Sequence, residues 1–168
     1  MSQTNYLNRI RFWLAIFMAG LILSGITAFP LESELSWLVR MFEVPWLRPL
    51  ATSTHLLPWI ERVHFALTTT NAQYPFLAYG TDWLAFGHLV IAVGFFGAYL
   101  DPVRNRWLLT FGLIACAGVV PLALIAGSIR GIPPGWRLID CGFGVFGAIP
   151  LLIARRALRA LEQESVLK

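Results

Sequence analysis

Four apolar stretches, each about 20 residues long, dominate this chain of 168 residues. They cover residues 12–30, 83–100, 107–127 and 138–154. A helix rises about 1.5 Å per residue, so each stretch is long enough to cross a hydrocarbon layer about 30 Å thick. The sequence therefore predicts an all-α fold: an integral membrane four-helix bundle, with residues 1–168 forming a single membrane domain.

The composition agrees with this prediction. Hydrophobic residues make up 57% of the chain and charged residues 13%, whereas an ordinary soluble domain has about 25% charged residues. The 13 lysines and arginines are scattered, and most of them flank the predicted spans. Membrane topology explains such a distribution better than a nucleic-acid surface does, so we expect no nucleic-acid partner.

The positions of the basic residues predict the orientation. Eight of the thirteen fall on one side of the predicted membrane: Arg9, Arg11, Arg104, Arg106, Arg155, Arg156, Arg159 and Lys168. Loops rich in lysine and arginine stay in the cytoplasm, so both termini are expected to be cytoplasmic. The seven tryptophans lie near predicted span ends or in the long outer segment, as an aromatic belt requires. We expect a multi-pass protein of the cell inner membrane.

The long outer segment, residues 31–81, shows helical periodicity twice. Apolar residues recur at helical spacing from Leu31 to Phe42, and again from Leu57 to Leu67. This predicts about two amphipathic helices that form an outer helical cap, with Ser53 and Thr54 as candidate N-caps of the second. Such a cap is either a lid over a site or interfacial packing, and we favour packing.

Each span also contains two small residues four positions apart, the spacing that lets helix backbones approach in lipid. The pairs are Gly20 and Ser24, Gly94 and Ala98, Gly112 and Cys116, and Gly144 and Ala148. They predict a close-packing face on every span, although one such face is equally suited to a neighbouring chain.

The two short connections carry turn signals. In residues 101–106, Asp101 and Pro102 end one helix, and Asn105 is placed to cap the next. In residues 128–137, Gly131 is typical of a helix C-cap.

Five ionisable residues converge on the outer side of the predicted bundle: Asp82, His88, Arg130, Arg137 and Asp140. Ionisable groups at membrane depth are costly and usually mark a site, so these residues are the candidate ligand-binding residues. Structural explanations also exist. Asp82 and Arg130 suit the dipoles of their helix ends, and Arg137 and Asp140 have the spacing of a salt bridge.

His88 lies nearly two turns inside its span, where no water satisfies its ring nitrogens. One structural partner is the carbonyl of Ala117, which Pro121 frees from its helical hydrogen bond. The alternatives are a role in ligand binding or proton transfer, or a role as a metal ligand. Glu61 and His64 have a spacing found in metal sites, but no second such motif accompanies them. We predict no metal and no cofactor, and no motif identifies catalytic residues.

Three segments, residues 81–88, 101–105 and 129–141, resemble those of small, functionally uncharacterised bacterial four-span inner-membrane proteins. The resemblance covers most of the chain. It implies the same architecture and brings no activity and no functional residue with it.

Three functions fit these features. The leading hypothesis is a membrane protein whose outward-facing polar pocket binds an anionic small molecule or a lipid headgroup, with Arg130 and Arg137 holding the anion. The second is an accessory or assembly subunit of a larger membrane complex. The third is a membrane-embedded enzyme that acts on a lipid or quinone-like substrate, with His88 as acid or base. The expected partners are membrane lipid, an anionic ligand, and a second copy of the chain or a larger complex.

Overall fold

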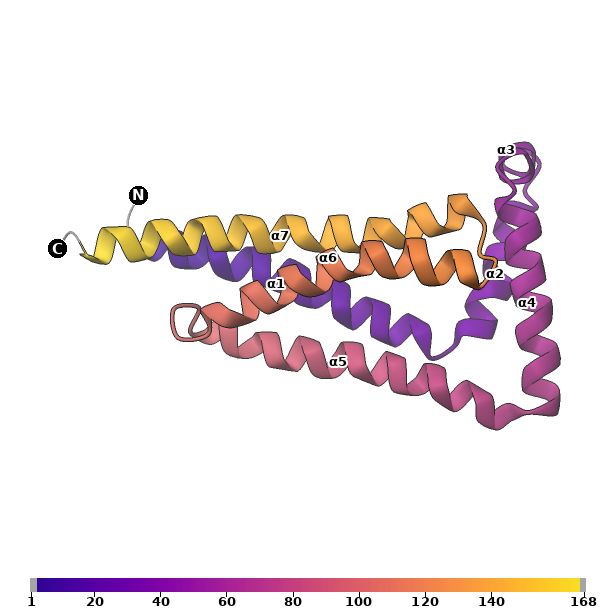
Figure 1. Cartoon of the computed structure of the whole chain (residues 1–168), viewed down its shortest axis with the longest axis horizontal. Coiled ribbons are helices and arrows are strands. Elements are labelled where there is room, and N and C mark those ends of the chain that lie inside the picture. Colours follow the sequence, from indigo (N-terminus) through magenta and orange to yellow (C-terminus); the bar gives the residue numbers. More distant parts are fainter. Residues whose placement is uncertain (1–2, 167–168) are drawn as a thin grey trace.

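The computed structural model describes residues 3–166, and all of its secondary structure is helical (Figure 1). The elements are α1 (Gln3–Ala28), α2 (Leu31–Phe42), α3 (Arg48–Ser53), α4 (Leu56–Gln73), the 3-10 helix η1 (Pro75–Ala78), α5 (Tyr79–Leu100), α6 (Arg106–Ile129) and α7 (Pro134–Val166). Four helical segments are long and apolar enough to cross a membrane: α1, η1 with α5, α6 and α7. The chain is therefore a multi-pass membrane protein with the four predicted spans, although α1 and α7 extend well beyond the predicted bounds.

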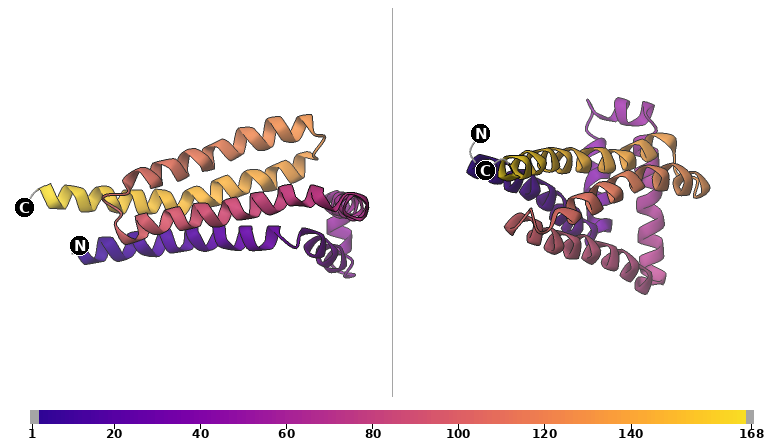
Figure 2. Two further views of the ribbon diagram at one scale, coloured as in Figure 1. Left: turned by 90° about the horizontal axis from the view of Figure 1, so that it is seen from below. Right: turned by 60° about the vertical axis from the view of Figure 1, so that its left-hand side comes forward.

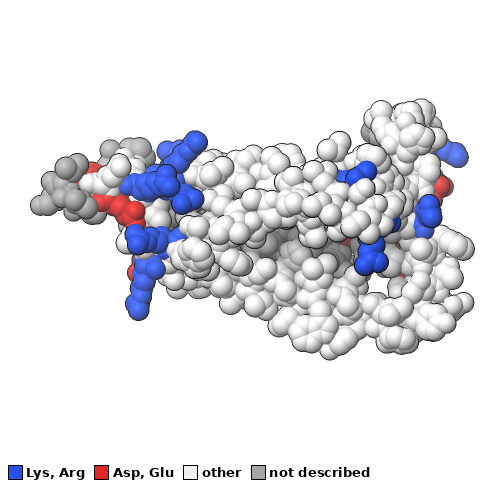
Figure 3. Space-filling model, in the orientation of Figure 1, with Lys and Arg blue, Asp and Glu red and all other residues white. Residues whose placement is uncertain are grey.

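The long helices run side by side, and the three short ones lie at one end of them. The start of α1 and the end of α7 share the opposite end, which we call the terminal end (Figure 1). Helices α2, α3 and α4 gather at the end away from the termini, which we call the outer end, and α4 runs across the bundle there (Figures 1 and 2). Charged side chains collect at the two ends, and the surface between them is nearly free of charge (Figure 3). This is the distribution that a bilayer requires.

The four spans do not all touch one another. Helix α1 packs along α5 and α7, and α6 packs along α7, but α5 and α6 make little contact although a short turn joins them. The helices therefore follow the order α5, α1, α7, α6 around the bundle. Helix α5 diverges from α6 and α7 toward the outer end, which leaves the bundle open on that side (Figure 1).

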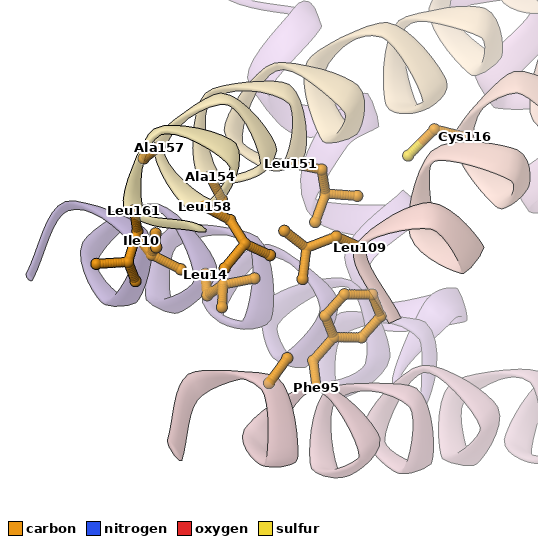
Figure 4. Close-up of a cluster of buried hydrophobic side chains, with 11 residues drawn as sticks. Ile10, Leu14, Phe95, Leu109, Cys116, Leu151, Ala154, Ala157, Leu158 and Leu161 are labelled. Atoms are coloured by element: carbon orange, nitrogen blue, oxygen red, sulfur yellow. The ribbon is translucent and has the colours of Figure 1, made fainter. Parts of the chain in front are cut away.

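The core lies toward the terminal end. Ile10 and Leu14 of α1, Phe95 of α5, Leu109 of α6 and Leu151 of α7 are fully buried. Figure 4 shows these side chains pointing toward one another from the four helices. Within a bilayer such packing stabilises by close van der Waals contact, because lipid is as apolar as the core. The bundle is thus closed at the terminal end and splayed at the outer end.

Glycines set the closest helix contacts. A Cβ atom on Gly112 would lie 2.7 Å from Cδ1 of Leu151, and one on Gly144 would collide with the carbonyl oxygen of Cys116. The predicted small-residue faces of α6 and α7 are therefore confirmed.

The same prediction is wrong for the glycines of α1 and α5. A Cβ on Gly20 or Gly94 would meet no atom within 4 Å. Helix α1 instead approaches α5 at Gly25, where a Cβ would lie 2.9 Å from the carbonyl oxygen of Ala85. The four-residue spacing identifies a face on which backbones can meet, and the crossing of the two helices decides which glycine is used.

Two side chains at the terminal end cover the carboxyl end of α5. Arg11 of α1 donates hydrogen bonds to the carbonyl oxygens of Tyr99 (3.1 Å) and Leu100 (3.2 Å). Asn105 precedes α6 as predicted, but its side chain makes no hydrogen bond to an amide of that helix. It donates instead to the carbonyl oxygens of Gly97 (3.1 Å) and Asp101 (2.9 Å). The predicted capping role is therefore wrong, because an asparagine in so short a turn reaches the end of the preceding helix.

The turn between α6 and α7 follows the prediction. Gly131 has a φ of 70°, in the left-handed region that favours glycine. The amide of Ile132 donates to the carbonyl oxygen of Gly127 (2.9 Å), and the amide of Gly131 donates to the carbonyl oxygen of Ser128 (3.1 Å). This is the Schellman arrangement, which satisfies the last carbonyls of α6.

At the outer end, α2 and α4 are the two helices that the periodicity predicts. Two side-chain hydrogen bonds join them: Ser36 Oγ to His64 Nε2 (2.8 Å) and Asn71 Nδ2 to Glu32 Oε2 (2.8 Å). The short helix α3 between them was not expected.

The predicted N-caps of α4 are wrong. Ser53 and Thr54 both donate back to the carbonyl oxygen of Leu50 in α3 (3.0 and 2.8 Å). Helix α4 instead follows His55, whose φ of 57° marks a sharp change of chain direction. Both hydroxyls donate to a carbonyl of α3, a helix that the sequence pattern does not predict.

Candidate functional site

The divergence of α5 from α6 creates a cleft of about 1140 Å³, which residues of all four spans line. In Figure 3 the nearly uncharged middle of the molecule is visibly hollowed between these helices. Gly20 lines the cleft, and because a Cβ there would meet no atom within 4 Å, its missing side chain adds to the width of the cleft. Every lining residue belongs to a helical segment that is long and apolar enough to span a membrane.

The lining changes from apolar to polar along the cleft. Toward the terminal end it consists of aromatic and aliphatic side chains, among them Trp13, Phe17, Phe95 and Phe111. Phe17 and Phe95 pack against each other with ring centroids 4.7 Å apart.

Four polar residues line the outer part: Ser24, Thr27, His88 and Asp140. They gather there because α1 ends at the outer end while α5 and α7 begin there. No lysine or arginine is among the described residues that line the cleft.

The imidazole of His88 is held by its own helix. Its Nδ1 lies 2.8 Å from the carbonyl oxygen of Leu84. A carbonyl oxygen only accepts hydrogen bonds, so Nδ1 is the donor and, in the neutral ring, Nε2 is left as an acceptor. The expected bond to the carbonyl of Ala117 is not formed in the described part of the chain.

Asp140 lines two spaces at once. Besides the cleft, it borders a smaller pocket of about 240 Å³ between α6 and α7, together with Arg130 and apolar residues. Val119 also lines both spaces, so the small pocket adjoins the cleft. Arg130 follows the last turn of α6 and is exposed.

Arg137 faces neither space. Its Nη1 donates to the carbonyl oxygen of Leu124 (3.4 Å), and the chain carbons of Arg137 cover Gly127, whose added Cβ would lie 2.8 Å from Cδ. Its Nε is buried and has no partner among the described residues. The structure shows no ion pair between Arg137 and Asp140 within 4.0 Å in residues 3–166.

The five candidate residues thus occupy different places. His88 and Asp140 line the cleft, Arg130 and Asp140 line the small pocket, and Asp82 and Arg137 line neither. Ser24 and Thr27 were not among the candidates. A hydroxyl within an otherwise apolar span is the one sequence signal that they carry, and the four-residue spacing from Gly20 predicts a packing role for Ser24.

Glu61 and His64 lie in different surroundings. His64 Nε2 bonds to Ser36, whereas Glu61 lies exposed on the surface of α4. Within residues 3–166 the structure shows no group of three or more His, Cys, Asp or Glu side chains able to hold a metal ion.

No family model matches this chain, and comparisons with curated proteins and with solved structures find no significant similarity.

Proposed function

We propose that this protein binds one membrane lipid in the cleft between α5 and α6. The observation that supports this most strongly is the direction of the lining, which is apolar toward the terminal end and polar toward the outer end. A lipid has the same two parts. Its chain would lie among Phe17, Phe95 and Phe111, and its head would lie beside His88 and Asp140.

The size and the opening of the cleft suit such a ligand. Its volume of about 1140 Å³ lies slightly above the range of ordinary ligand pockets, which span about 300–1,000 Å³. Because α5 and α6 make little contact, the cleft opens sideways toward the surrounding bilayer. A lipid would enter it without leaving the membrane.

The orientation is part of the proposal. We place the termini in the cytoplasm and the polar part of the cleft near the opposite leaflet of the cell inner membrane, because most basic residues flank the terminal end of the spans.

A glycine pair allows a clean test. A Cβ on Gly20 or on Gly94 would meet no atom within 4 Å, so both sites tolerate a larger side chain. Gly20 lines the cleft and Gly94 does not. Gly20→Leu therefore fills part of the cleft, while Gly94→Leu is its matched control on another span.

The experiment is native mass spectrometry and lipid analysis of both variants and the wild type after extraction in mild detergent. We expect about one retained lipid per chain in the wild type and in Gly94→Leu, and a clear loss in Gly20→Leu. Equal retention in all three, or a wild-type chain without lipid, contradicts the proposal. A second protein that co-purifies with a lipid-free chain would favour the subunit hypothesis instead.

A further inference from the structure

We infer that the head of the lipid is an uncharged hydrogen-bond donor, such as the hydroxyl of a lipid alcohol, and is not an anion. This inference rests on the proposed function and specifies its ligand. It differs from the anionic head that the arginines suggested in the sequence, because the structure places those arginines outside the cleft.

The charges in the cleft disfavour an anionic head. The carboxyl group of Asp140 lines the cleft, and no lysine or arginine does. A phosphate or carboxylate head would lie beside that carboxylate in a medium of low dielectric, with no lysine or arginine in the lining of the cleft to balance it. Arg137 donates to the carbonyl oxygen of Leu124 on α6 and is not a lining residue of the cleft, and Arg130 lines the small pocket that Asp140 also borders.

The hydrogen-bonding groups of the cleft favour a head that donates. His88 uses Nδ1 to donate to Leu84, so Nε2 of the neutral ring is the nitrogen left for a ligand, and it accepts. An ionised carboxylate also only accepts. A head that brings a donor hydrogen satisfies these groups, whereas a ketone or an ester brings none.

The hydroxyls of the cleft can complete the interaction. Thr27 donates to the carbonyl oxygen of Ser24 (3.4 Å), which leaves the lone pairs of the Thr27 hydroxyl as acceptors. Ser24 and Thr27 lie on α1, while His88 and Asp140 lie on α5 and α7. A hydroxyl head at the outer part of the cleft is therefore surrounded by polar groups from three helices.

Three probes with one chain and different heads test this inference. Farnesol carries a hydroxyl donor, farnesyl acetate only acceptors, and farnesyl phosphate an anion. Binding of each to the delipidated full chain in neutral detergent at pH 7.5 is measured by isothermal titration calorimetry. We expect farnesol to bind about tenfold more tightly than either of the others, the usual effect of one unmatched buried polar group.

An Asp140→Asn variant, with its fold checked by circular dichroism, tests whether Asp140 recognises the head of the lipid. An amide can donate as well as accept and carries no charge, so we expect the variant to lose most of the preference for farnesol. Retained preference in this variant would overturn the assignment of Asp140.

The other outcomes distinguish the inference from the proposed function. Farnesyl phosphate binding as tightly as farnesol overturns the inference, and so does a charged phospholipid as the single lipid retained by the extracted wild type. In both cases the lipid-binding function still stands. If no probe binds and the extracted protein carries no lipid, the proposed function fails as well.

Discussion

Replacing Gly144 with alanine tests the contact that forms one wall of the cleft. The added Cβ would collide with the carbonyl oxygen of Cys116 and would lie 3.2 Å from Cβ of Val119. The clash is with backbone, so α6 and α7 must move apart. Overpacking of this kind costs about 1–3 kcal/mol, and alanine returns up to about 1 kcal/mol through its higher helix propensity. We expect a net loss of about 1–2 kcal/mol in the free energy of unfolding.

Gly142→Ala is the matched control on the same helix. Its added Cβ would make ordinary contacts with the ring of Phe146, at 3.5 and 3.7 Å. Both variants gain the same helix propensity, so the difference between them isolates the strain, about 1–3 kcal/mol. The measurement is reversible unfolding in mixed micelles with increasing dodecyl sulfate, followed by circular dichroism. Unfolding free energies of the two variants that agree within about 0.5 kcal/mol would refute the close α6–α7 contact.

Three further predictions use the same unfolding assay. Arg11→Ala should lower stability by about 1 kcal/mol, because two carbonyls at the end of α5 lose a charged donor, and an unchanged midpoint would show that those bonds contribute nothing. Gly131→Ala should cost about 1–2 kcal/mol, since alanine is strained at a φ of 70°, whereas Gly135→Ala, with open space around it and no positive φ, should be near neutral. Ser36→Ala and His64→Ala should show a coupling energy of about 0.5–1.5 kcal/mol in a double-mutant cycle, and strictly additive effects would mean that the bond between α2 and α4 is not formed in solution.

The spans could be predicted because length and hydropathy decide them with little influence from tertiary context. A stretch such as residues 107–127 is stable within a bilayer as a helix, because its backbone groups then bond to one another, and α6 is that helix. The same holds for Gly131, where the required φ excludes almost every other residue.

The polar end caps could not be predicted, because a short side chain reaches either of two helix ends. Asn105 stands at the start of α6 yet bonds to α5, and Ser53 and Thr54 bond back to α3. The composition of these turns is compatible with both arrangements, and the three-dimensional path of the chain selects one.

The cleft depends on a quantity that no local pattern contains. It exists because α5 packs on α1 and diverges from α6, and the angle between two spans follows from the packing of the whole bundle. Hydropathy therefore identifies His88 and Asp140 as ionisable residues within spans. It does not predict that they lie beside an apolar space. Sequence position groups the arginines with them, but the Arg137 side chain bonds to the carbonyl oxygen of Leu124 on α6.

An experimental density map of the wild-type chain in a lipid nanodisc tests most directly whether the space between α5 and α6 holds a lipid within the bilayer. We predict that α5 and α6 stay apart toward the outer end, with elongated density that extends from Phe95 to a head beside His88 and Asp140. Helices α5 and α6 in contact along their full length, with no space between them, would contradict the account.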